Sequence, residues 1–144
     1  LLFFLFACAS TQQASVATQT EKNIYTVDEL LDQLPADNSF DEDLILYSLC
    51  QRGEGAIVNA LLQLESKEYD KAEYAMHGLT RYFTKASDAH KAAIQNAFYA
   101  TCLKKLSVAN KALLIDEIHK IADGKAVPVL APFLKDENLC DPAA

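Results

Sequence analysis

The sequence of 144 residues contains no tryptophan and has only four glycines, four prolines and one methionine. With so few glycines, it has no glycine-rich loop of the kind that cradles phosphate groups, and no GxSxG motif of a serine hydrolase. The HExxH and CxxC motifs of many zinc and redox sites are also missing. The usual short motifs of nucleotide binding, hydrolysis and metal catalysis are therefore absent from this sequence.

Basic residues are scarce in the segment that precedes residue 55. From Glu21 to Glu54 there are nine acidic residues and two basic ones, whereas residues 55–144 carry eleven of each. The net charge of −7 therefore comes from this acidic segment. An acidic protein without a basic face binds nucleic acid poorly, so we do not expect a nucleic-acid partner. A run of acids is otherwise typical of a solvated helix surface.

The first eight residues have the character of an export signal. Leu1 to Phe6 form an uninterrupted apolar run that is far shorter than the roughly 20 residues needed to span a bilayer. Such a run fits the apolar region of a signal peptide, and because no Met or basic segment precedes it, we expect residues 1–8 to be a truncated signal. Residues 9–22 are mostly small and polar, which is typical of a flexible tether.

The end of this signal, Leu5-Phe6-Ala7-Cys8, resembles the lipobox of bacterial lipoproteins. In that motif a small residue precedes an invariant cysteine, which is lipidated and becomes the mature N-terminus. The resemblance implies a lipid on Cys8 that anchors the protein to a bacterial membrane, in the periplasm or at the cell surface. The alternative is an ordinary signal peptide in which the cysteine occurs by chance.

The rest of the chain has the apolar spacing of helices. In the segment 70–83, apolar side chains recur three and four residues apart and therefore share one helix face. This face consists of Ala72, Ala75, Met76, Leu79 and Phe83. We expect a helix over Tyr69–Lys85 and a preceding helix over Ala56–Leu64, joined as an antiparallel hairpin. No sustained alternation of period two occurs, so the sequence predicts an all-α protein.

The other segments predict helices of similar length with short connections. Residues 44–50 are apolar nearly all round, which predicts a helix buried on two sides. Pro132 is expected to kink the last long helix, and Gly124 to cap its predecessor in a left-handed conformation. The expected helices cover residues 28–34, 41–52, 88–105, 107–122, 125–135 and 142–144, with Thr26 or Asp28, Ser87 or Asp88, Ser107 and Asp141 as caps. The expected inward stripes are Ile94, Ala97, Phe98, Thr101 and Cys102 in one helix, and Leu114, Ile115, Ile118, Ile121 and Ala122 in the next.

Helix pairs recur along the sequence with a period in the thirties. The first helices of successive pairs begin near Ala56, Ala89 and Ala126, about 33 and 37 residues apart. This period is the mark of an α-solenoid, in which helix pairs stack on one another. The sequence therefore predicts an α-α superhelix of antiparallel helix pairs and a fragment of a longer repeat array. An acidic helix pair over residues 23–54 precedes repeats over 55–144, the last of them incomplete.

The last unit resembles a HEAT repeat of the bacterial HEAT-like form. Its first helix carries Val127-Pro128 and Leu134, Asp136 follows in the turn, and Asp141-Pro142 with two alanines begins the second helix. The resemblance extends over residues 55–144 and implies a curved scaffold that binds proteins or peptides and has no catalytic residues. Tetratricopeptide-like repeats share the period and are the alternative fold, although their characteristic Trp, Leu-Gly, Tyr and Pro positions are not in register here.

The resemblance also implies where a partner binds, because the second helices of such solenoids line the concave side. On the helix Tyr69–Lys85, the face opposite the apolar stripe carries Tyr74, His77, Gly78, Arg81 and Lys85. On the helix 107–122, the corresponding face carries Leu113, Asp116, Glu117 and Lys120. Tyr and Arg often supply interface energy, so we predict a protein-binding groove along these two faces. A plain solvated surface is the alternative.

Enzymatic and metal-binding functions have little support in the sequence. His77, His90 and His119 are scattered, and no residues have the spacing of metal ligands or of a catalytic triad. We therefore expect no cofactor, no metal and no catalysis by this chain. The sequence predicts a non-catalytic protein–protein interaction scaffold of the bacterial cell envelope. The alternative is a repeat module of a larger envelope enzyme or assembly factor whose catalytic part lies beyond residue 144.

The three remaining cysteines, Cys50, Cys102 and Cys140, each fall in or beside an apolar helical stretch. Three thiols cannot all pair with one another, and their spacing matches no metal motif. We expect them to be free and buried.

Overall fold

The computed structural model describes residues 25–144, and the expected signal peptide, lipobox and tether lie outside this range. Within it the chain forms helices and no strand, which confirms the predicted all-α class. No helix in the described range is long and apolar enough to cross a bilayer. The helices and two 3₁₀ segments are α1 (Val27–Leu31), α2 (Ser39–Gln51), α3 (Glu54–Leu62), η1 (Gln63–Glu65), α4 (Tyr69–Phe83), α5 (Asp88–Cys102), α6 (Val108–Ile121), α7 (Ala126–Leu130), η2 (Ala131–Lys135) and α8 (Cys140–Ala143).

Polar side chains begin four of these helices, three of them at predicted positions. Thr26 caps α1 reciprocally, because its hydroxyl accepts from the Glu29 amide while the Glu29 carboxylate accepts from the Thr26 amide at 2.6 Å. Ser87 and Ser107 cap α5 and α6 through their hydroxyls. At α2 the cap is Asn38, so this helix begins before the acids that were expected to open it.

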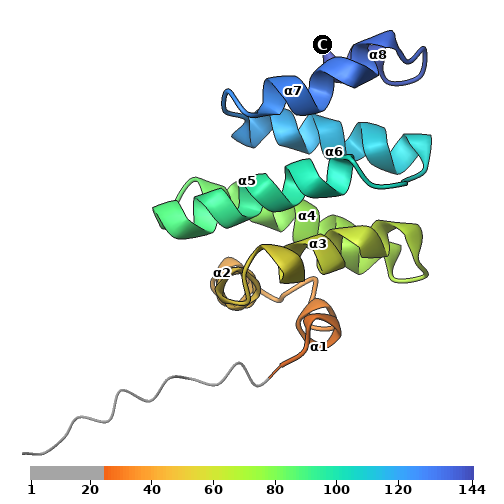
Figure 1. The fold of residues 1–144 in the computed structure, drawn as a ribbon. Coiled ribbons are helices and arrows are strands. Elements are labelled where there is room, and N and C mark those ends of the chain that lie inside the picture. The colour runs from red at the N-terminus through yellow and green to blue at the C-terminus, as the bar shows by residue number, and fades with distance from the viewer. Residues whose placement is uncertain (1–24) are drawn as a thin grey trace, which may run out of the picture.

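The helices lie in two layers. One layer contains α1, α3, α5 and α7 and the other α2, α4, α6 and α8, and each helix contacts its neighbours within its layer. Consecutive helices, such as α3 with α4 and α5 with α6, also contact each other across the layers. Figure 1 shows α3 to α8 side-on, stacked toward the top, and α1 and α2 nearly end-on below them. The N-terminal pair therefore crosses the α3–α4 pair steeply.

The core lies between the two layers and includes the stripe predicted for α4. Ala72, Ala75, Met76 and Leu79 are fully inaccessible to solvent, and Phe83 is half-buried. The predicted stripes of α5 and α6 are buried too: Ile94, Ala97, Phe98, Thr101 and Cys102, and Leu114, Ile115, Ile118 and Ile121. Small side chains on α4 let neighbouring helices approach closely, which is how this stripe contributes to a dense core.

The prediction that α2 is buried on two sides was wrong. Leu44 and Tyr47 are 55% and 46% exposed, whereas Leu46 and Leu49 on the opposite side are 1% exposed. The reason is the place of α2 at the N-terminal end of its layer. Among the described residues, α2 has a neighbour within its layer on one side only, which is α4.

The turn after α6 also differs from the prediction. Gly124 does not adopt the left-handed conformation, since Gly53, which precedes α3, is the only glycine of residues 25–144 with a positive φ, of 83°. Ala122, predicted to face inward, is exposed. The turn is held instead by Tyr99, whose hydroxyl donates to the Asp123 carboxylate at 3.1 Å and accepts from the Asp123 amide at 3.2 Å.

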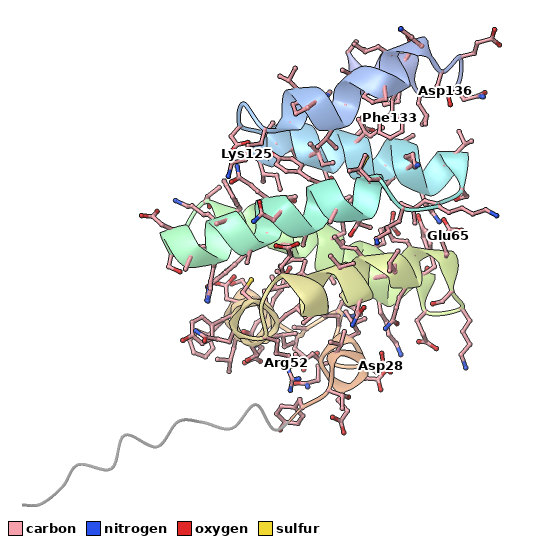
Figure 2. The ribbon with its side chains drawn as sticks, viewed as in Figure 1. Asp28, Arg52, Glu65, Lys125, Phe133 and Asp136 are labelled. Atoms are coloured by element: carbon pink, nitrogen blue, oxygen red, sulfur yellow. The ribbon has the colours of Figure 1, made fainter. Side chains whose placement is uncertain are left out.

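Glu65 joins the turn between α3 and α4 to the start of α6. Its Oε1 atom accepts from the Ser107 amide and from the Asn110 side chain, both at 2.8 Å. These bonds, the one from Ser107 first, hold the pKa of the Glu65 carboxyl below its ordinary value. Figure 2 shows Glu65 at the end of the hairpin, beside the loop between α5 and α6.

The C-terminal segment is interrupted near Pro132, as the sequence predicts. There α7 gives way to the 3₁₀ segment η2, because proline removes a backbone donor. The Nζ atom of Lys111 lies 5.0 Å from the centroid of the Phe133 ring on η2, and this contact joins η2 to α6. The prediction that Asp141 caps the last helix was wrong, since α8 follows Leu139 and Asp141 lies inside it.

Candidate functional site

The predicted binding surface lies along α4 and α6, which are neighbours in one layer. The exposed members of the predicted set are Tyr74, Arg81, Lys85, Asp116 and Lys120, and the half-buried members are His77 and Leu113. Gly78 and Glu117 are buried, so the prediction that both face the solvent was wrong. The surface therefore has a buried polar group beneath it that the sequence pattern did not indicate.

That buried group is the carboxylate of Glu117, whose residue is 1% exposed. The Nδ1 atom of His77 lies 2.8 Å from its Oε1 atom, and the Thr80 hydroxyl donates to its Oε2 atom at 2.6 Å. Lys120, one turn further along α6, also donates to Oε1. A buried charge is tolerated only when it is paired and hydrogen-bonded, and these three side chains meet that requirement.

The environment of Glu117 contains two opposing effects on its pKa. Burial favours the neutral acid and raises the pKa. The hydrogen bonds from Lys120 and Thr80 and the charges of His77 and Lys120 favour the carboxylate more strongly, so the pKa lies below its ordinary value. Glu117 is therefore an anion at neutral pH, fixed between α4 and α6.

His77 is the residue of this cluster whose chemistry could suit a catalytic base. Its Nδ1 atom faces Glu117, and its Nε2 atom lies 3.9 Å from a carboxylate oxygen of Glu73. The hydroxyl of the cluster, on Thr80, is on a residue that is 7% exposed and is already bonded to Glu117. His77 therefore joins α4 to α6 through Nδ1, while its Nε2 atom lies near a carboxylate of its own helix.

Arg81 near the end of α4 and Lys85 just after it are directed toward α2. Arg81 pairs with Glu42, and Lys85 pairs with Asp43. Each of these partly exposed pairs contributes at most about 1 kcal/mol to stability. These pairs nevertheless limit what the surface offers to a partner, because the cations of both Arg81 and Lys85 are engaged within the chain.

The approach of α2 to α4 is close at Gly78. A Cβ atom at this position would lie 2.9 Å from the Oε1 atom of Glu42 and 2.9 Å from a methyl carbon of Leu46. The absence of a side chain at Gly78 therefore lets α2 cover this part of α4. This explains why Gly78 is buried although it lies on the face predicted to be open.

Two polar residues of the predicted surface, Tyr74 and Asp116, have side chains that are not engaged by other described residues. Tyr74 is 49% exposed, Asp116 is exposed, and neither forms a side-chain hydrogen bond or ion pair with another residue in 25–144. Leu113 is half-buried against the core. This side of α4 and α6 therefore presents an aromatic ring, an apolar edge and a carboxylate to the solvent.

A second polar cluster, which the sequence analysis did not predict, lies between α1 and the α3–α4 turn. It lines a cleft of about 420 Å³. The Lys71 ammonium bonds the carboxylates of Asp32 at 2.6 Å and Glu68 at 2.8 Å, and these bonds raise the pKa of Lys71. Gln63 donates to Asp28, labelled in Figure 2, at 2.6 Å. The partners in the Gln63–Asp28 and Lys71–Asp32 bonds are 35 and 39 positions apart in the sequence, so no local sequence pattern indicates them.

The cysteines and possible metal ligands do not form a site in the described residues. Cys50, Cys102 and Cys140 are free, as predicted, and the first two are buried while Cys140 is half-buried. Burial raises the pKa of the Cys50 thiol to about 12 and that of Cys102 to about 11. Among residues 25–144, no three His, Cys, Asp or Glu side chains are grouped to hold a metal ion.

Comparison of the chain with protein-family models, curated proteins and solved structures finds no match to any of them. Function is therefore inferred from the surfaces described above.

Proposed function

We propose that this protein is a non-catalytic scaffold of the bacterial cell envelope that binds other proteins, built as a HEAT-like solenoid and tethered by a lipid on Cys8. The observation that carries the proposal is the layered order of the helices, with α3, α5 and α7 in one layer and α4, α6 and α8 in the other. The first helices of these pairs begin at Glu54, Asp88 and Ala126, 34 and 38 residues apart. Solenoids bury their core by such stacking of successive pairs and present one layer to partners.

The proposed partner surface is the outward side of α4 and α6 around Tyr74 and Asp116. Support for this place comes from the chemistry left free on it, an exposed aromatic ring beside an unpaired carboxylate. The ion pairs of Arg81 and Lys85 join this part of the chain to α2, and the contact of His77 with Glu117 joins α4 to α6, so the three helices are held in a fixed arrangement. A fixed surface loses little conformational freedom when it binds.

The test replaces Tyr74 with a photoreactive phenylalanine derivative in the source bacterium. Irradiation is expected to join the chain to one or a few discrete proteins, identified by mass spectrometry. Asn96 is the matched control, since it is exposed on α5 in the other layer. With a partner so identified, Tyr74→Ala is expected to weaken its binding about tenfold, or roughly 1.4 kcal/mol, at an unchanged melting temperature. Equal cross-linking at Asn96 and Tyr74 would contradict the proposed surface.

The proposed anchor is tested separately. The native precursor is expected to incorporate a labelled fatty acid and to fractionate with membranes, because an acyl chain on Cys8 supplies membrane affinity. Cys8→Ala is expected to abolish the label. A label that persists in this variant would refute lipidation at Cys8 and leave the scaffold proposal untouched.

A further inference from the structure

The outer side of α2 carries a row of exposed apolar side chains. Phe40, Leu44 and Tyr47 are 74%, 55% and 46% exposed. Their spacing of four and three residues places them on one helix face, directly opposite the buried face that includes Leu46 and Leu49. α2 is therefore apolar on two opposite sides. One side meets the core, and on the other Phe40 and Leu44 are exposed while the Tyr47 ring contacts the His90 ring of α5, with 5.3 Å between their centroids. An exposed apolar row of this kind commonly marks an interaction site.

A groove between α1 and α2 runs beside this row. It consists of two hollows, of about 220 Å³ and about 340 Å³, which share Gln33, Asp41 and Ile45 in their linings. Buried Leu30 and Ile45 contribute apolar surface, and exposed Tyr25 and Leu44 also line the first hollow. The groove thus offers apolar surface next to the apolar row Phe40, Leu44 and Tyr47 on α2. These two hollows, together with Phe40, Leu44 and Tyr47, are called the α1–α2 groove.

The charged residues around the α1–α2 groove are predominantly acidic. Residues 25–54 contain eight acidic residues and one basic residue. No Lys, Arg or His lines either hollow, whereas Asp41 lines both and Asp37 lines one. Within the described part of the chain, neither of these two carboxylates pairs with a basic side chain, in contrast to Glu42 and Asp43, which pair with Arg81 and Lys85. The Asp41 carboxylate accepts a hydrogen bond from the Asn38 side chain at 2.7 Å, which does not neutralise its charge. The groove therefore combines apolar contact with negative charge that no basic side chain balances.

We propose that the α1–α2 groove binds a cationic, amphipathic helical segment of a partner protein, with leucine-like side chains on Leu44 and Phe40 and Lys or Arg beside Asp41 and Asp37. Helix-in-groove recognition uses apolar anchors three and four residues apart, which matches the spacing of the row on α2. Complementary charge at the rim sets the orientation and speeds association. The row spans about two turns of helix, so a partner segment of about three turns covers it.

Charge disfavours the other occupants of this surface. A second copy that met this face with its own would bring acidic residues against acidic residues, which is repulsive. An anionic lipid surface would be repelled in the same way. Residues 1–24 of this chain contain one acid and one base, so they offer no complementary charge. A basic partner segment is the occupant that satisfies both the apolar and the acidic features.

This inference goes beyond the scaffold proposed above, because it concerns a different surface and specifies the chemistry of the partner. It does not depend on the α4–α6 face. Tyr74→Ala is expected to leave binding at the α1–α2 groove unchanged, and changes on α2 test the groove alone. The failure of either proposal can therefore be recognised without reference to the other.

The test measures fluorescence anisotropy of a labelled peptide of leucine and lysine, about as long as α2 and in amphipathic-helix order, with the full-length chain. A second peptide with glutamate in place of every lysine is the control. The lysine peptide is expected to bind, and the affinity to fall as salt is raised, because exposed charges are screened. Leu44→Gln and Asp41→Lys are each expected to weaken binding about tenfold.

Matched control variants lie at the opposite end of the chain. Val127 on α7 is 68% exposed, and Asp136 is exposed after η2, so Val127→Gln and Asp136→Lys repeat the same chemical changes elsewhere. They are expected to alter binding less than twofold. Circular dichroism and melting temperature establish that each variant is folded. Should Leu44→Gln be unstable, Phe40→Gln replaces it, since Phe40 is 74% exposed.

Several outcomes would overturn the proposal. One is equal binding of the two peptides, and another is equal loss of affinity in the α2 variants and in their matched controls. Self-association that Leu44→Gln abolishes would assign the face to a second copy, and sedimentation with anionic vesicles that this variant abolishes would assign it to lipid. A photoreactive group on the lysine peptide must also cross-link to residues 25–51, and cross-links elsewhere would refute the site.

Discussion

The Nδ1 atom of His77 lies 2.8 Å from the Oε1 atom of Glu117, a contact between residues 40 positions apart that joins α4 to α6. It belongs to a cluster in which Thr80 and Lys120 bond the same carboxylate. An ionised group in the interior is costly unless its partners are all present. Removal of the Glu117 carboxylate would therefore leave polar groups on both α4 and α6 without their partner.

The first prediction concerns Glu117→Gln. The neutral amide cannot balance the positive charge of Lys120, and it is a weaker acceptor for His77 and Thr80. The free energy of unfolding at neutral pH is therefore expected to fall by about 1–3 kcal/mol, measured by urea unfolding followed by circular dichroism. Glu137→Gln is the control, because Glu137 is exposed, and a change below about 0.5 kcal/mol is expected there. Equal changes in the two variants would show that the buried cluster contributes no net stability.

The second prediction is the pH dependence of that difference. The pKa of Glu117 is lower in the native chain than its ordinary value of 4.5, so its contribution is present above about pH 4.5 and is lost as pH falls through the native pKa. The stability gap between the parent and Glu117→Gln is therefore expected to shrink as the pH falls from about 4.5 toward 3. The depressed pKa values of Glu29 and Glu65 affect both proteins equally and cancel in the gap. A gap that stays constant down to pH 3 would contradict a lowered pKa at Glu117.

Periodicity in the sequence identified the buried stripes of α4, α5 and α6 but not the burial of Glu117. The stripe of a helix follows from the spacing of its apolar residues. Glu117 is buried because α6 contacts three helices, α4, α5 and α8. Together these helices cover the apolar stripe of α6 and also part of its polar side. His77 and Thr80, which compensate the charge, lie on another helix. A single helix pattern cannot contain that information.

The opposite error occurred at α2 and has a related cause. The apolar residues 44–50 predict burial all round, and Leu44 is nevertheless 55% exposed. Periodicity describes what a helix could bury, whereas its position in the stack decides how many neighbours are there to bury it. Leu44 is exposed because α2 stands at the end of its layer, and this is why the α1–α2 groove was found only from the structure.

The third prediction concerns thiol reactivity. Burial raises the pKa of Cys50 to about 12 and that of Cys102 to about 11, so almost no reactive thiolate is present at pH 8. In a Cys8→Ser variant, Ellman's reagent is expected to titrate about one thiol rapidly, that of half-buried Cys140, and the other two only on unfolding in denaturant. Cys140→Ser should remove the rapid phase and leave the slow ones. Rapid reaction of all three thiols in the folded chain would refute the burial of Cys50 and Cys102.

The last prediction concerns the contact between α4 and α2 at Gly78. Alanine has the higher helix propensity by about 1 kcal/mol, so in an open helix Gly78→Ala would stabilise the chain. Here the added methyl group would lie 2.9 Å from a methyl carbon of Leu46, a residue that is 1% exposed. Because Leu46 has little room to move, the cost of overpacking is expected to exceed the gain in helix propensity. The free energy of unfolding is therefore expected to fall by about 1–3 kcal/mol.

Gly55→Ala is the matched control for this change. Gly55 lies in the first turn of α3, and no atom lies within 4 Å of a Cβ built on it, so the substitution is expected to be neutral or slightly stabilising. If Gly78→Ala is also neutral or stabilising, α2 does not approach α4 as closely as 2.9 Å implies. If it destabilises, Leu46→Ala in the same chain should recover part of the loss, because it removes the methyl group that the new side chain meets. Such non-additivity is expected only for residues in direct contact, and a double-mutant cycle between Gly78 and Leu46 measures it.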